Sequence, residues 1–195
     1  MGQAALEITA ASYVSPDDYL RLECEAVEKH EYFYGEIRVM AGASYAHNRI
    51  CANMTGELHG LLRGKNCAVV GSDQRLQILS GQAYVYPDVT VVCGPPEFNE
   101  EKKPDTLLNP TLLVEVLSPT TGQYDRSDKF MLYRQVPSLR QYLTLDSLVV
   151  HAELYTLDGL GRWVLTETRD LTAVLDLASI GCQVPLAEAY AGVTF

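Results

Sequence analysis

The spacing of apolar residues predicts two helices and a hairpin in the first third of the chain. Five apolar residues recur at helical intervals, so we expect a helix over residues 44–63: Ile50, Met54, Leu58, Leu61 and Leu62. An earlier helix is expected from Ser15 to about residue 27, because serine is a good N-cap and the proline and two aspartates that follow suit a first turn. Between the helices, short strands over residues 31–34 and 36–40 flank a glycine turn.

Strand-forming segments dominate the rest of the chain. Residues 111–117 form a continuous apolar run interrupted by one charge, which is typical of a strand buried on both faces. A helix is expected over residues 123–135, where Val136 and Pro137 end it, and a short one over residues 186–190. The other predicted strands cover residues 67–70, 75–79, 84–93, 140–146, 148–157 and 162–167.

This order of elements predicts an α/β fold. We expect a central mixed β-sheet flanked by helices, with an N-terminal helix and hairpin and with C-terminal strands. The length of 195 residues suits one domain, 1–195, in which residues 1–14 form a flexible or peripheral segment.

Composition excludes several classes of protein. No apolar run reaches the roughly 18 residues that cross a bilayer, and the N-terminus does not resemble a signal peptide, so we expect a cytoplasmic protein with no membrane partner. The five cysteines include no Cys-x-x-Cys pair and the four histidines no i, i+4 pair, so oxygen ligands are expected for any metal. Cys67 and Cys93 lie in apolar runs and are expected to be small core residues.

The net charge is −10, from 15 basic and 25 acidic residues. Such a balance is unusual for a protein that holds DNA tightly, because neutralisation of phosphates supplies most of the affinity. An acidic chain can still act on DNA through a local basic patch, a bound cation or a partner.

Two carboxylates interrupt segments that otherwise favour the core. Glu115 lies inside the apolar run 111–117, where an unpaired carboxylate is costly to bury. Asp88 follows Pro87, which indicates a strand edge or a bulge. If the two strands are neighbours, both carboxylates can converge on one cation. Mg²⁺ commonly takes one or two protein carboxylates and fills its other positions with water and phosphate oxygens.

Lys129 lies on the predicted helix that follows the Glu115 strand. Asp125, Lys129 and Tyr133 are spaced i, i+4, i+8 and therefore share one helical face. A lysine directed at a metal–carboxylate site can orient the attacking water and offset charge in the transition state.

These residues and their surroundings resemble the bacterial Uma-two family. The motifs are specific in combination and span nearly the whole chain. They comprise Pro87-Asp88, Glu115 near the end of a buried strand, the segments 118–121 and 125–129, residues 30–37, His47, Tyr133, residues 137–142 and residues 185–190.

The resemblance implies a restriction-endonuclease-like core of the PD-(D/E)xK superfamily, which hydrolyses phosphodiester bonds of DNA with Mg²⁺, or with Mn²⁺ in its place. It implies Asp88 and Glu115 as metal ligands and Lys129 as the catalytic lysine. Two positions depart from the pattern. The lysine of Glu-x-Lys would stand at Leu117, so Lys129 must supply the amine, and Tyr34 stands where the family often has an acidic residue.

Each of the three residues also has a purely structural interpretation. Asp88 could cap the start of a strand after proline. Glu115 could form a buried structural salt bridge with Lys129 or Arg75. Lys129 could pair with Asp125 on the surface.

Four further residues form a second tier of candidates. Glu31 and Glu36 of the hairpin could reach the site, although exposed strand carboxylates are common. His47 could contact a phosphate or act as an acid, or it could simply pack or cap its helix end. Gln74, on the strand before Asp88, could orient a ligand.

Three functions remain open at this point. The first is a Mg²⁺-dependent endonuclease that cuts DNA with metal-activated water. The second is a nuclease-fold module, with weak or no catalysis, that binds nucleic acid or a protein partner. The third is a hydrolase of another phosphate-containing substrate, since a fold does not fix a function. Because double-strand cutting needs two sites, analogy allows a homodimer for the first function.

Overall fold

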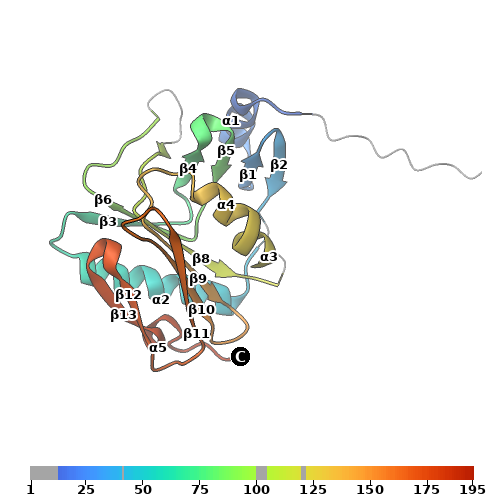
Figure 1. The fold of residues 1–195 in the computed structure, drawn as a ribbon. Coiled ribbons are helices and arrows are strands. Elements are labelled where there is room, and N and C mark those ends of the chain that lie inside the picture. Colours follow the sequence, from blue (N-terminus) through green and yellow to red (C-terminus); the bar gives the residue numbers. More distant parts are fainter. Residues whose placement is uncertain (1–12, 41, 100–104, 120–121) are drawn as a thin grey trace, which may run out of the picture.

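The computed structural model describes residues 13–40, 42–99, 105–119 and 122–195 (Figure 1). The expected peripheral segment 1–14 therefore lies almost wholly outside the described residues. The helices are α1 (Pro16–Glu25), α2 (Tyr45–Leu62), α3 (Gly122–Tyr124), α4 (Phe130–Tyr133) and α5 (Leu186–Ala189), with a π-helical turn η2 (Asp125–Lys129) and 3₁₀ turns η1 (Leu79–Gly81) and η3 (Ala178–Ile180). The strands are β1 (His30–Phe33), β2 (Glu36–Val39), β3 (Cys67–Gly71), β4 (Arg75–Ile78), β5 (Ala83–Val85), β6 (Val89–Cys93), β7 (Thr106–Leu107), β8 (Leu112–Leu117), β9 (Gln141–Asp146), β10 (Ala152–Leu157), β11 (Trp163–Thr168), β12 (Val174–Leu177) and β13 (Cys182–Pro185).

Both predicted N-terminal helices form, α1 with the expected Ser15 cap and α2 with a Ser44 cap that was not predicted. The Ser15 hydroxyl oxygen accepts a hydrogen bond from the Asp18 backbone N–H at 3.1 Å, and Ser44 does the same for His47 at 3.2 Å. Helix α1 ends at Glu25, two residues earlier than expected. The apolar face of α2 is buried at four of the five predicted positions, whereas Leu61 is 38% exposed.

The predicted central mixed sheet is present, with strand order β11-β10-β9-β8-β6-β3. Within it β8 and β9 are parallel and the other described pairings are antiparallel. A second sheet, β2-β1-β5-β4-β7, was not predicted. The prediction of one strand over residues 84–93 was wrong, because the segment divides at Tyr86–Asp88 into β5 and β6, which join different sheets. Pro87 has no N–H to continue a ladder at this point.

All six residues of β8 are buried, and they divide between two cores. Leu112, Val114 and Val116 pack with the apolar face of α2. Leu113 packs on the opposite side, in the core that includes Phe130 and Tyr133 of α4. Because strand side chains alternate between faces, Glu115 shares the Leu113 side and is directed toward the α3–η2–α4 segment. Figure 1 shows that segment and α2 on opposite sides of the β8–β9 strands.

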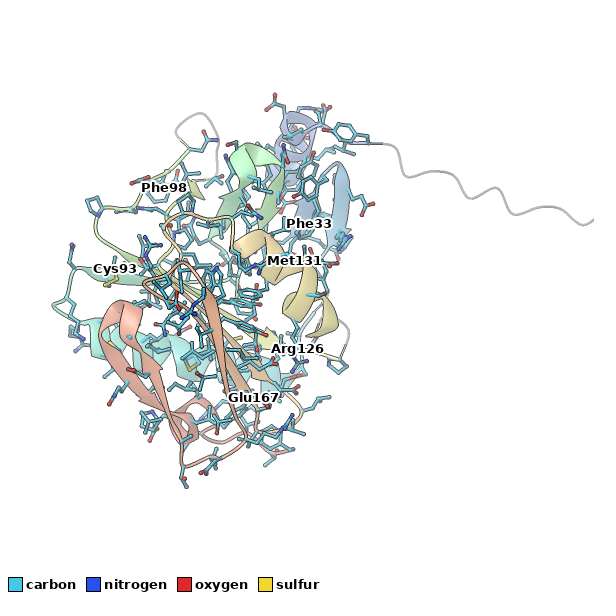
Figure 2. The ribbon with its side chains drawn as sticks, in the orientation of Figure 1. Phe33, Cys93, Phe98, Arg126, Met131 and Glu167 are labelled. Carbon is cyan, nitrogen blue, oxygen red and sulfur yellow. A yellow bond between two sulfur atoms is a disulfide. The ribbon has the colours of Figure 1, made fainter. Side chains whose placement is uncertain are left out.

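The helix expected over residues 123–135 is interrupted by a π-helical turn at Asp125–Lys129. Such turns occur mostly inside α-helices and often at functional sites. Beside it, Phe33 of β1 and Met131 of α4 help to line a pocket of about 310 Å³ between the hairpin and the helical segment (Figure 2).

Two features of the sheets were not predicted. The hairpin β12–β13 was not expected, and its buried residues pack in the α2 core. Cys67 and Cys93 pack against that core but are joined in a disulfide, because the antiparallel register of β3 and β6 places them directly opposite each other. Among the described residues, no helix is long and apolar enough to span a membrane.

Candidate functional site

Glu115 lies at the centre of a buried polar cluster between the two sheets. Its Oε1 atom accepts a hydrogen bond from the Tyr133 hydroxyl at 2.6 Å and lies 2.9 Å from Lys129 Nζ. Burial raises the pKa of Glu115 to about 8, and the nearby carboxylates act in the same direction, although the ammonium of Lys129 opposes them. The ammonium of Lys129 is therefore the group that favours the ionised form of Glu115 in this buried site.

Lys129, the last residue of η2, joins three carboxylates. Its Nζ atom lies 2.9 Å from Glu31 Oε1, 2.9 Å from Glu115 Oε1 and 3.5 Å from Asp125 Oδ1. Burial alone would lower the pKa of Lys129, but the carboxylates raise it well above its usual value. The side chain is only 7% exposed, so the interpretation of a surface pair with Asp125 is wrong.

Asp88 stands where the antiparallel β6–β8 ladder ends. Its Oδ2 atom accepts a hydrogen bond from the Val116 N–H at 2.7 Å, and its own N–H points to Glu115 Oε2 at 3.4 Å. Burial acts to raise the pKa of Asp88, but His47, the Val116 N–H and Lys129 lower it overall. The condition for the two carboxylates to converge is met, because Asp88 immediately precedes β6 and β6 pairs with the strand that carries Glu115.

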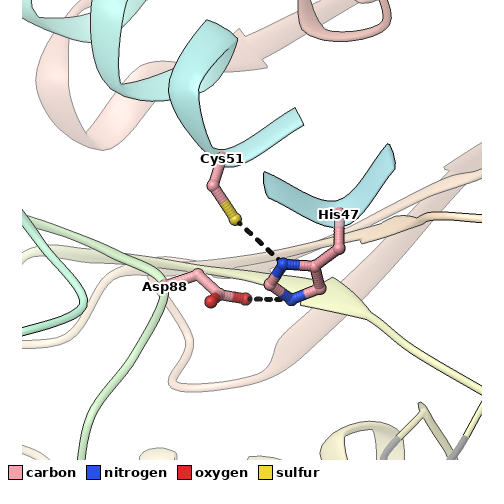
Figure 3. Close-up of side chains that lie close together, drawn as sticks. All are labelled: His47, Cys51 and Asp88. Carbon is pink, nitrogen blue, oxygen red and sulfur yellow. Dashed lines mark hydrogen bonds and ion pairs between the residues drawn. The ribbon is translucent and has the colours of Figure 1, made fainter. Parts of the chain in front are cut away.

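His47 contacts Asp88 from the other side of the sheet (Figure 3). Its Nε2 atom lies 3.3 Å from Asp88 Oδ2, and its Nδ1 atom lies 3.5 Å from Cys51 Sγ. Burial acts to lower the pKa of His47, but Asp88 raises it overall.

Two of the second-tier candidates, Glu31 and His47, therefore lie in the cluster, and two do not. Glu36 is exposed and pairs with Arg38 at 3.1 Å. The side-chain amide of Gln74 donates to the backbone carbonyls of Arg75 and Asp105, so it anchors a loop. The expectation that either contributes to the site is not supported by their contacts.

The sequence reasoning assigned no site role to Asp125, Tyr133 or Cys51. The i, i+4, i+8 spacing of Asp125, Lys129 and Tyr133 was the available signal for the first two. Cys51 follows His47 by four residues on α2, so a histidine–cysteine pair on one helix face was readable in the same way. The alternative partner proposed for Glu115, Arg75, instead donates to Thr106 Oγ1 at 3.0 Å.

The donor chemistry of the cluster fits a hard divalent cation. Three carboxyl groups (Glu31, Glu115 and Asp125) contact the ammonium group of Lys129, and a fourth, Asp88, lies near enough for that ammonium to lower its pKa. Carboxylate oxygens are the ligands that Mg²⁺ prefers, and Asp88 and Glu115 are the pair presented by adjacent strands.

Comparisons with known proteins identify the family of the chain and its fold. The Uma2 family, described as "Putative restriction endonuclease", matches residues 16–187. Two proteins of Synechocystis sp., both called uncharacterized, are similar to this chain. The protein slr1290 is 37% identical over 93% of this chain and 94% of its own length, and sll1609 is 33% identical over 88% of this chain and 96% of its own length. A crystal structure from Anabaena variabilis, titled as a putative nuclease belonging to DUF820, superposes with a TM-score of 0.76 at 16% identity, covering 93% of this chain and 99% of that one, and so shares the fold. The chain belongs to the Uma2 family of restriction-endonuclease-like proteins.

Proposed function

We propose that the protein is a metal-dependent endonuclease that hydrolyses phosphodiester bonds of DNA. The observation that carries the proposal is the excess of carboxyl groups over cationic groups around Lys129, with Asp88 and Glu115 on adjacent strands. An enclosed cluster of this composition is costly unless a cation shares it.

Asp88 and Glu115 would hold Mg²⁺ or Mn²⁺, which supplies a water of lowered pKa and neutralises charge on the phosphate. Tyr133 fixes the Glu115 carboxylate through its short hydrogen bond. His47 and the Val116 N–H fix Asp88 and keep it ionised. Lys129 places an ammonium group beside Glu115, where it can orient a water and offset charge on the phosphate in the transition state.

Arg38 supports DNA as the substrate despite the acidic net charge. Its guanidinium stacks over the rings of Phe33 and Tyr124, with distances of 5.1 and 5.0 Å to the ring centroids, and its side chain is 47% exposed. The pKa of Tyr124, raised mainly by burial, also responds to Glu31 and Lys129, so Arg38 lies near the cluster. A stacked, accessible arginine suits contact with a phosphate or a base. A homodimer would place two such sites on one duplex.

The test measures cutting of plasmid and single-stranded DNA with Mg²⁺, Mn²⁺ or a chelator. The native protein is compared with Asp88→Asn and Lys129→Met. Asp73→Asn and Lys29→Met are matched controls, because those two residues form an exposed ion pair elsewhere. We expect metal-dependent cutting that falls at least about 100-fold in the first two variants and stays near the native rate in the controls.

Circular dichroism confirms that each variant is folded before its rate is interpreted. Equal cutting by Asp88→Asn and the native protein would refute the site. Absence of cutting by a folded native protein that still binds Mn²⁺ would favour a nuclease-fold module that binds nucleic acid or a protein partner.

A further inference from the structure

We propose that His47, Cys51 and Asp88 form a second metal site, which takes a borderline-soft ion of the Zn²⁺ class. His47 and Cys51 lie one turn apart on α2, and Asp88 approaches them from the entry to β6 (Figure 3). One donor atom from each residue lies within 4.8 Å of the other two. No part of the proposed hard-cation site requires the thiol of Cys51.

The donor set decides the class of ion. A thiolate and an imidazole are the ligands that favour Zn²⁺ and similar ions, whereas Mg²⁺ avoids sulfur. Around a tetrahedral Zn²⁺ ion, ligand atoms at their usual bond lengths are about 3.5 Å apart. The separation of 3.5 Å between Cys51 Sγ and His47 Nδ1 is already of that size, whereas the 3.3 Å contact with Asp88 Oδ2 is made by the other ring nitrogen, Nε2.

Only one ring nitrogen of His47 can bind a given ion. The imidazole now presents Nδ1 to the thiol and Nε2 to the carboxylate, so binding requires side-chain rotations that bring the three donors together. The three donor atoms lie at most 4.8 Å apart, so they must approach one another by about 1 Å to reach the spacing of ligands around Zn²⁺. The thiol proton of Cys51 leaves to solvent as the thiolate binds, and a fourth ligand position remains for water.

A second group of possible ligands, His151, Glu153 and Glu167, offers a comparison within the same chain. There Glu153 already accepts a hydrogen bond from Arg126 at 2.6 Å and another from Thr144 at 2.9 Å. A metal would have to break that ion pair. Binding at His47, Cys51 and Asp88 also disturbs an existing contact, the 3.3 Å pair between His47 and Asp88, but of these two groups this is the one that includes sulfur.

Asp88 belongs to both proposed sites, so an ion in the second site affects the first. An ion held by His47 and Cys51 draws the Asp88 carboxylate toward α2 and away from Glu115. Under the proposed nuclease function, Zn²⁺ is therefore an inhibitor that competes with Mg²⁺ through one shared ligand. The inhibition rests on the proposed function, whereas binding of Zn²⁺ does not.

The first experiment titrates the full chain with Co²⁺, a spectroscopic substitute for Zn²⁺, and records the thiolate-to-cobalt charge-transfer absorption. We expect this band in the native protein, in Cys24→Ser and in His151→Gln, and its loss in Cys51→Ser. Displacement of Co²⁺ by Zn²⁺ gives the Zn²⁺ affinity, which should weaken at least about tenfold in His47→Gln. Cys24→Ser is the matched control because Cys24, like Cys51, is not joined in a disulfide. A native protein without the band, or a band that persists in Cys51→Ser, would overturn the proposal.

The second experiment adds Zn²⁺ to the Mg²⁺-supported cutting reaction. Each variant is compared with its own rate without Zn²⁺, so a change in its basal rate does not matter. We expect inhibition of the native protein at Zn²⁺ concentrations that leave Cys51→Ser uninhibited. Equal inhibition of both would refute the shared-ligand consequence. A cobalt band in a protein that cuts no DNA would reject the nuclease function and keep the metal site.

Discussion

Replacement of Lys129 by methionine tests how strongly the acidic cluster depends on its one ammonium group. The variant keeps much of the side-chain volume but leaves Glu31, Glu115 and Asp125 facing one another in a buried site. At 2.9 Å each of the two short ion pairs is worth about 6 kcal/mol in gross Coulomb energy at an effective dielectric constant of 20. Burial of the charges offsets most of this, and removal of one partner from a buried pair typically costs about 3–5 kcal/mol.

We therefore expect Lys129→Met to lower the free energy of unfolding at pH 7 by about 4 kcal/mol, measured by urea denaturation. The loss should shrink at acid pH, where the carboxylates take up protons. Lys29→Met is the control, because Lys29 pairs with an aspartate that is 97% exposed and should cost less than about 1 kcal/mol.

The double variant Lys129→Met/Glu115→Gln tests how much of this loss of stability comes from Glu115. It should be more stable at pH 7 than Lys129→Met alone, because it removes the carboxylate that loses its closest partner. Equal losses in Lys129→Met and Lys29→Met would refute the reasoning, since the cluster would then behave like an exposed ion pair.

Three other changes have defined outcomes. Ser15→Ala should lower the free energy of unfolding by about 1 kcal/mol through loss of the α1 cap, and no loss in urea denaturation would contradict that role. Reduction of the Cys67–Cys93 disulfide, which links positions 26 residues apart, should lower it by about 3 kcal/mol, while the Cys67→Ala/Cys93→Ala variant should not respond to reductant. Burial acts to lower the pKa of His47, but the Asp88 carboxylate raises it above 6.5 overall. The stability that the His47–Asp88 pair contributes is therefore present below pH 6.5 and is lost as the pH rises through the pKa of His47 in the folded protein. The difference in free energy of unfolding between the native protein and His47→Gln should therefore shrink as the pH rises above 6.5. A difference that does not change with pH would contradict a stabilising His47–Asp88 pair.

Local patterns were sufficient to predict the two N-terminal helices and the chemistry of the core strand. The cap at Ser15 and the apolar face of α2 depend on neighbours in the sequence, and both are confirmed. The conflict between Glu115 and its apolar surroundings correctly indicated a buried carboxyl group with a partner. Such a conflict is visible in sequence because burial of charge is costly wherever the strand lies.

Pairings between distant segments could not be predicted. The second sheet depends on the break at Pro87, because β5 before it and β6 after it pair with strands of different sheets. The disulfide depends on the register of β3 against β6, which one position of slip would destroy. The π-helical turn that carries Lys129 has no sequence signature among the patterns used. Glu31 reaches Lys129 because the N-terminal hairpin packs against the α3–η2–α4 segment, a tertiary contact.

The most direct test of the metal site is anomalous diffraction from crystals of the full chain soaked in Mn²⁺. We expect one anomalous peak within bonding distance of carboxylate oxygens of both Asp88 and Glu115, beside the Lys129 ammonium group. Absence of the peak, or a peak that contacts neither carboxylate, would contradict a hard-cation site in this cluster and remove the principal support for a metal-dependent nuclease.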